Sequence, residues 1–96
     1  MSIQSIIRMR VKMDIIKLRS KAKTLEPITR IGKKGLTEAV VAEIRRLLNK
    51  RKLIKVKILK SALENKDKKE VMEELVNKTN AVLIEAVGFV VVLARK

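Results

Sequence analysis

The sequence has 96 residues, with 24 Lys and Arg against 10 Asp and Glu, so its formal net charge is +14. A chain of this length suits a single small domain with one compact core. Because Cys and His are both absent, the sequence offers no disulfide, no Cys/His zinc site and no catalytic triad that depends on an imidazole base. Phe89 is the only aromatic residue, which excludes a base-stacking platform built from several aromatic side chains.

The positive charge is unevenly distributed along the sequence. Residues 1–60 hold 18 Lys and Arg and 4 Asp and Glu, whereas residues 61–96 hold 6 of each kind. Charge of either sign at any position would keep a protein soluble, but a polyanion requires cations gathered on one surface. The distribution therefore indicates a nucleic acid as the partner.

The apolar segments are too short to suggest a membrane partner. The longest uninterrupted one, Ala86–Ala94, is far below the roughly 20 residues that a membrane-spanning helix requires. The first residues lack the apolar stretch and the small-residue cleavage site of a signal peptide. We therefore expect a cytoplasmic protein.

The first predicted element is an amphipathic helix from Ser2 to about Lys23, because apolar residues recur there in steps of three and four. Cations flank the apolar stripe, among them Arg19 and Lys23. Taken alone, this helix fits a solvated surface and a nucleic-acid contact equally well. Residues 1–12 are open to interpretation as an N-terminal extension, with Met13 as an alternative start. A second apolar strip could seat a protein partner; it consists of Ile6, Met9, Met13 and Ile16.

The next predicted elements are a short strand and a second helix, joined by a glycine-rich loop. Pro27 interrupts the first helix, and the apolar/polar alternation of Ile28–Ile31 then predicts a strand. The loop Gly32–Gly35, with the sequence GKKG, follows directly. Thr37 can cap the second helix, which we expect to end near Lys50.

The GKKG loop has the features of an anion-binding turn. Its two glycines permit a sharp turn and close approach of another chain, while free N–H groups at the start of the next helix point the same way. Lys33 and Lys34 add positive charge. A GxxG pattern alone fits a plain turn as well as a phosphate site. The Walker spacing is absent and no acidic residue stands as an obvious magnesium partner, which disfavours nucleotide hydrolysis.

The second half of the sequence predicts a basic strand, then a third helix, and then two further strands. Leu53–Lys60 alternates apolar residues with Lys55 and Lys57, which predicts a strand with one core face and one basic face. Lysines on such a strand also prevent edge pairing without any ligand. We expect a helix after the capping pattern formed by Asp67 and Glu70.

The remaining signals complete the element order. Asn80, which tolerates the left-handed conformation, is predicted to stop the third helix. Ala81–Val87 and Val90–Ala94 then form a hairpin around Gly88. The order α-β-α-β-α-β-β predicts a two-layer α/β domain with a four-stranded sheet that is partly parallel.

One long stretch resembles a known family. Leu18–Leu59, LRSKAKTLEPITRIGKKGLTEAVVAEIRRLLNKRKLIKVKIL, is closely similar to the CRM domain, the chloroplast RNA splicing and ribosome maturation family, in its stand-alone prokaryotic form. The shared pattern is a basic helix, a proline-led strand, a GxxG loop followed by Leu-Thr, an amphipathic helix and LIKVK. The resemblance continues to AVGFVVVLARK and covers about Met13–Lys96. Ala94 stands where the family commonly has tyrosine, and Asn80 stands where it commonly has glycine.

The resemblance implies a fold, a function and a site. The fold is a single α+β domain over residues 1–96 with a four-stranded mixed sheet, similar to the C-terminal domain of translation initiation factor 3. The function is RNA binding, with ribosomal RNA or the maturing large ribosomal subunit as partner and ribosomal proteins as neighbours. No enzymatic activity, cofactor, metal or small-molecule substrate is implied. The GKKG loop would contact the RNA, helped by basic residues of the flanking helices and sheet.

The candidate RNA-binding residues combine the implied loop with basic residues around it. Two other functions stay open: a DNA-binding protein of the chromatin type, and a structural ribosomal protein or interaction module whose charge is incidental. An RNA hydrolase is disfavoured because no acid–base pair or metal cluster is visible in the sequence. The candidate residues are Arg19, Lys23, Arg30, Gly32, Lys33, Lys34, Gly35, Thr37, Arg45, Arg46, Lys55 and Lys57.

Overall fold

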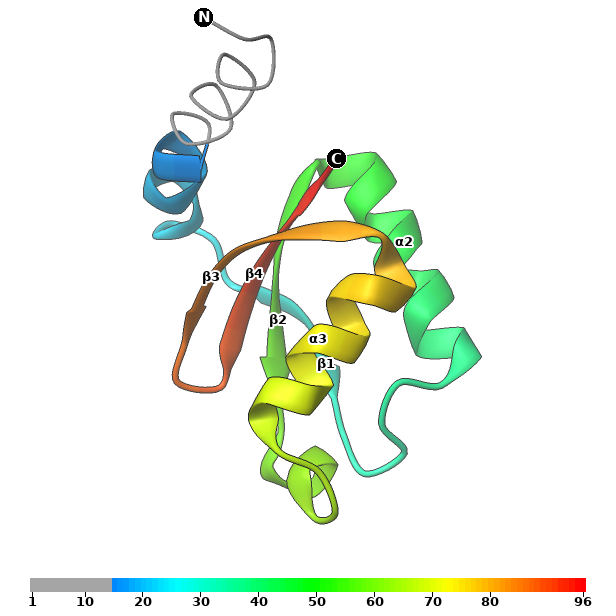
Figure 1. Ribbon diagram of the computed structural model, residues 1–96. Coiled ribbons are helices and arrows are strands. Elements are labelled where there is room, and N and C mark those ends of the chain that lie inside the picture. Colours follow the sequence, from blue (N-terminus) through cyan, green and yellow to red (C-terminus); the bar gives the residue numbers. More distant parts are fainter. Residues whose placement is uncertain (1–14) are drawn as a thin grey trace, which may run out of the picture.

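The computed structural model describes residues 15–96. The helical segment 15–22 comes first, and the predicted helix before residue 15, with most of its second apolar strip, lies outside the described residues. None of the helices in residues 15–96 is long and apolar enough to cross a membrane. The elements that follow (Figure 1) are β1 (Pro27–Ile31), α2 (Glu38–Arg51), β2 (Leu53–Ile58), the 3₁₀ helix η1 (Lys60–Leu63), α3 (Lys68–Thr79), β3 (Ala81–Val87) and β4 (Val90–Arg95).

The four strands form one mixed sheet in the order β1-β2-β4-β3. Strands β1 and β2 are parallel, because α2 carries the chain back between them. Strand β4 is antiparallel to both of its neighbours, β2 and β3. The predicted α+β fold with a four-stranded mixed sheet is confirmed.

The main core lies between the sheet and helices α2 and α3. Alternation along β2 turns Ile54, Val56 and Ile58 toward the helices, and all three are almost fully buried. Helix α2 contributes apolar residues at helical spacing, and α3 contributes two more. The helix residues of this core are Ile44, Leu47, Leu48, Val71 and Leu75.

A second, smaller core lies on the other face of the sheet. Ala22 of segment 15–22 is only 1% exposed and packs against Leu53 and Ile84. Arg19 Nε also donates a hydrogen bond to the carbonyl oxygen of Ile84, over 3.3 Å. Figure 1 shows this segment on the side of the sheet away from α2 and α3. The face of β2 that was predicted to be basic is therefore apolar at Leu53, where the segment covers it.

The structure differs from the prediction at one strand boundary and at one helix cap. Strand β2 ends at Ile58, and the chain then forms η1. The sequence did not predict η1, because a short 3₁₀ turn leaves no periodic pattern to detect. Asp67 occupies the N-cap position of α3, but its side chain makes no capping hydrogen bond. Other signals were read correctly: Asn80 closes α3 in the left-handed conformation, with φ 53° and ψ 40°.

Candidate nucleic-acid interface

The GKKG loop lies at the edge of the sheet where β1 and β2 both end. Parallel strands end at the same edge, so the loop after β1 lies beside η1, which follows β2 (Figure 1). The Leu59 N–H donates to the Ile31 carbonyl over 2.9 Å and fastens the two chain segments together. The Gly35 N–H donates to the Gly32 carbonyl, also over 2.9 Å, and closes the turn. The loop is therefore a defined turn anchored at its base.

The two glycines of the loop occupy different environments. Gly35 has φ +69°, a left-handed conformation that strains other residues. Gly32 does not require this conformation, and a Cβ atom added there would lie 3.7 Å from Leu59 Cδ1 and 3.9 Å from Ser61 Oγ, which is ordinary contact. The turn thus requires glycine at Gly35, whereas the protein's own packing does not require it at Gly32.

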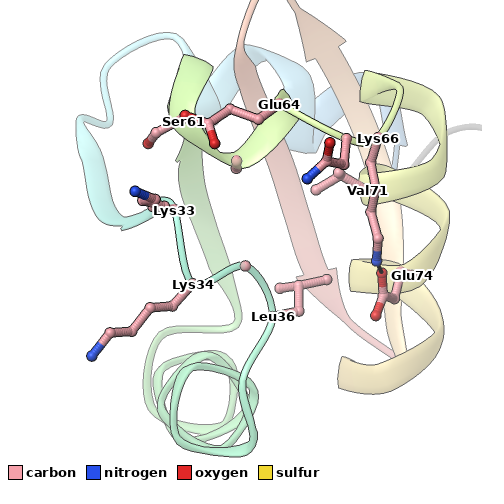
Figure 2. A pocket seen from close by; sticks show the side chains of 11 residues that line it. Lys33, Lys34, Leu36, Ser61, Glu64, Lys66, Val71 and Glu74 are labelled. Atoms are coloured by element: carbon pink, nitrogen blue, oxygen red, sulfur yellow. Dashed lines mark hydrogen bonds and ion pairs between the residues drawn. The ribbon is translucent and has the colours of Figure 1, made fainter.

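Lys33 and Lys34 form one rim of a concave surface between the loop, η1 and the first half of α3. Both lysines are exposed, and within residues 15–96 neither takes part in an ion pair. Figure 2 shows Lys34 extended away from the pocket, with Ser61 and Glu64 on the η1 side. The loop thus presents two ammonium groups that pair with no carboxylate within residues 15–96, although Glu64 lines the same surface.

The Glu74 carboxylate, on α3, lies in the wall of this surface and is already neutralised. Lys66 Nζ approaches Glu74 Oε2 at 2.8 Å, the pair marked by the dashed line in Figure 2. Lys78 Nζ approaches Glu74 Oε1 at 2.7 Å. The hydrogen bond from Lys66, followed by that from Lys78, lowers the pKa of Glu74 below its ordinary value of 4.5. Glu74 therefore remains an anion that two lysines satisfy.

The candidate residues of α2 have three separate roles. Thr37 caps the helix, because its Oγ1 accepts a hydrogen bond from the Val40 N–H over 3.2 Å. Arg46 forms a bidentate pair with Glu43, at 2.7 and 3.1 Å, which lowers the pKa of Glu43 and raises that of Arg46. Arg45 is exposed and lines the boundary between α2 and α3.

The remaining candidate residues lie on the opposite face of the sheet, toward segment 15–22. Arg30 and Lys57 are register partners on β1 and β2, and both are exposed. Lys23 and Lys55 line a shallow surface there together with Glu85. The structure thus places the GKKG loop and Arg45 on the helix side, and separates them by the sheet from Lys23 and Lys55. The candidate residues do not form one contiguous site.

Comparison with known proteins supplies the family. A model of the CRS1/YhbY (CRM) domain matches residues 12–95. The chain belongs to the CRM domain family. It is 45% identical over 78 residues to a probable RNA-binding protein of Methanocaldococcus jannaschii, covering 81% of this chain but only 58% of that relative. It is also 38% identical over 79 residues to a probable RNA-binding protein of Bacillus subtilis, covering 82% of this chain and 80% of the relative.

A solved structure shares the fold. The solution structure of a hypothetical protein from Staphylococcus aureus, for which RNA binding has been suggested, matches this CRM domain with a TM-score of 0.69 and 35% identity. The match covers 85% of this chain and 83% of the other. The arrangement of helices and sheet is therefore that of a CRM domain.

Sequence reasoning missed one neighbour of the loop in this CRM domain, Ser61, and one exposed aromatic side chain elsewhere, Phe89. Ser61, on η1, lies close to Gly32, and the unpredicted 3₁₀ turn brings it there. Phe89 is 40% exposed at the tip of the β3–β4 hairpin, with Lys68 Nζ 5.8 Å from the ring centroid. The Ile58 N–H donates to the Phe89 carbonyl over 2.7 Å, so the ring belongs to the same edge of the sheet as the loop. The hairpin signal around Gly88 could have suggested that exposure.

The described part of this CRM domain lacks the side chains of a metal centre. No group of three or more His, Cys, Asp or Glu side chains within residues 15–96 is arranged to hold a metal ion. The loop presents two exposed lysines, a side-chain type that contacts phosphate oxygens.

Proposed function

We propose that this protein binds RNA and that the GKKG loop holds the RNA backbone. Membership of the CRM family supports RNA as the partner, as do the names of the relatives, which are probable RNA-binding proteins. The observation that carries the proposal is a closed turn at the start of α2 whose two lysines face solvent without an ion-pair partner in residues 15–96. Lysines beside a helix N-terminus attract phosphate through their charge, and the backbone N–H groups of the first helical turn can donate hydrogen bonds to it.

We further propose a role in the maturation of the large ribosomal subunit, with ribosomal RNA or the precursor particle as partner and the cytoplasm as the place of action. The proposed role is binding without catalysis. The resemblance described above supports this role, and so does the excess of positive charge in residues 1–60. Because phosphate contacts dominate such an interface, recognition would depend on RNA shape and backbone more than on base edges.

Replacing both loop lysines tests the proposal. We expect Lys33→Ala with Lys34→Ala to weaken RNA binding and to flatten its salt dependence. Each lost phosphate contact reduces the slope of log K against log salt by about 0.7 to 0.9. Binding of a ribosomal RNA fragment would be titrated by fluorescence anisotropy at several salt concentrations.

A matched variant controls for the loss of charge. Lys17→Ala with Lys21→Ala removes the same net charge from exposed positions of segment 15–22. An unchanged slope in the loop variant, or an equal loss in both variants, would contradict the role of the loop. Competition with duplex DNA at the same salt concentration separates RNA binding from the chromatin-type alternative, because an RNA-binding protein would keep its RNA.

A further inference from the structure

Three concave surfaces follow one another from the GKKG loop along α2 to the C-terminal ends of α2 and α3. The first is the surface between the GKKG loop, η1 and α3, and the second runs from Leu36 along α2 to Arg45 and reaches Lys78 of α3. The third extends from Arg45 past the end of both helices to Arg95. Leu36 lines the first two surfaces and Arg45 lines the last two, so consecutive surfaces are neighbours that share a residue.

The two ends of this series lie at opposite ends of the strands of the sheet. The loop follows the end of β1, whereas Arg95 is the last residue of β4. Strand β4 is antiparallel to β2, and the Arg95 N–H donates to the carbonyl of Lys52, at the start of β2, over 2.9 Å. Helix α2 spans the distance between the ends: its 14 residues correspond to about 20 Å at 1.5 Å per residue.

The charge along the three surfaces is predominantly positive. Seven cationic side chains and three carboxylates line them, and the Glu74 carboxylate is matched by Lys66 and Lys78. Arg95 Nη1 donates to the carbonyl oxygen of Asn49 over 3.3 Å, a neutral partner that holds the guanidinium in place without cancelling its charge. Cations are thus available at the start, in the middle and at the end of the series.

We infer that the α2–α3 boundary guides one RNA strand from the GKKG loop past Arg45 to Arg95. This inference rests on the proposed function and adds the path and the class of RNA. A single strand fits because its backbone can follow a charged groove over several nucleotides, about 4 or more in known single-strand sites. The groove lacks aromatic side chains among its lining residues, so phosphate contacts carry the binding and base identity matters little.

The opposite face of the sheet is less suited to the same task. The surface at Lys23 and Lys55 includes the carboxylate of Glu85, and its other lining residues are apolar. Segment 15–22 covers part of this face, and Arg19 is engaged with the Ile84 carbonyl. The helix side offers the longer continuous path.

A length series of single-stranded RNA tests the path. Oligouridine of about 3 to 12 nucleotides would be titrated against the whole protein and against Arg45→Gln with Arg95→Gln, which keeps hydrogen-bonding groups at both positions. For the unaltered protein we expect affinity to rise with length until the groove is filled. The variant should bind the shortest oligonucleotides with normal affinity and the longest with about tenfold lower affinity. Its slope of log K against log salt should be smaller by about 1.4, because two single-strand phosphate contacts are lost.

Three comparisons make the outcome decisive. Lys17→Gln with Lys21→Gln removes the same charge from exposed positions of segment 15–22, on the other face, and should leave the length dependence intact. The inference is overturned if this control loses more affinity than the groove variant, if the groove variant matches the unaltered protein at every length, or if duplex RNA binds more tightly than single strands. Failure of the proposed function would appear differently, as normal binding of all lengths by Lys33→Ala with Lys34→Ala. Urea denaturation of each variant verifies that the exposed substitutions leave the fold intact.

Discussion

The two glycines of the loop illustrate how one residue type serves two purposes. At φ +69° an alanine is strained, so we expect Gly35→Ala to lower the free energy of unfolding by about 1 kcal/mol. At Gly32 a Cβ atom meets only ordinary contacts, so Gly32→Ala should leave the free energy of unfolding nearly unchanged. It should still weaken RNA binding, because the added methyl group holds the phosphate backbone away. Urea denaturation and RNA titration of both variants measure the two effects.

Gly88 provides a matched control for this pair. It also has a positive φ, +59°, and lies in the β3–β4 hairpin outside the loop. Gly88→Ala should destabilise the protein about as much as Gly35→Ala while leaving RNA affinity close to that of the unaltered protein. If Gly32→Ala bound RNA normally, close approach at Gly32 would be ruled out.

At the scale of elements, the Glu74 ion pairs join α3 to the chain segment that precedes it. Lys66 comes before the helix, and Lys78 lies one turn after Glu74 on it. The folded-state pKa of Glu74 is lowered, so the stabilisation is present above about pH 4.5 and disappears as the pH falls through the lowered value. Because these pairs lie at the surface, their contribution to the free energy of unfolding is at most about 1 kcal/mol.

Replacing Glu74 by glutamine tests this pH dependence. We expect Glu74→Gln to be less stable than the unaltered protein at pH 7, where the carboxylate is charged, and the difference to disappear as the pH falls through the lowered pKa of Glu74. Urea midpoints measured across this range check the expectation, and high salt should reduce the difference at neutral pH. A difference that stayed constant with pH would show that the charge of Glu74 contributes nothing.

At the scale of the whole molecule, the net charge of +14 opposes the compact state through self-repulsion. Raising the ionic strength from about 0.01 M to 0.1 M shortens the screening length from about 30 to 10 Å. We therefore expect salt to raise the Tm of the free protein and, at the same time, to weaken its binding to RNA. Thermal unfolding followed by circular dichroism, beside the RNA titrations, measures both trends. A Tm that fell with salt would mean that ion pairs outweigh the repulsion.

Local signals predicted the elements well. Thr37 and Asn80 act within one or two turns of their own helices, so their roles as helix start and helix stop could be deduced without tertiary information. The position of segment 15–22 could not be deduced in this way, because the same apolar stripe could cover either face of the sheet. Tertiary packing decides the face, because Ala22 and Leu53 belong to one buried cluster.

The candidate site was predictable in part. Turn chemistry and the family pattern indicated the loop, but adjacent helix residues point about 100° apart, so Arg45 and Arg46 face different surroundings. Glu43, three residues before Arg46, was the available signal that this arginine would be paired. Which basic residues share a surface depends on the packing of α2 and α3, and no local pattern records that packing.

We expect the position of β4 between β2 and β3 to affect when the protein becomes able to bind RNA during its synthesis. Strand β2 supports the loop through β1 and Leu59, yet its other edge is completed only by β4, which follows the other described strands in the sequence. Contacts so distant in sequence form late, after their loops have closed. We expect the nascent chain to remain incompetent for RNA until β4 has left the ribosomal exit tunnel, which would prevent a half-made copy from occupying its own target.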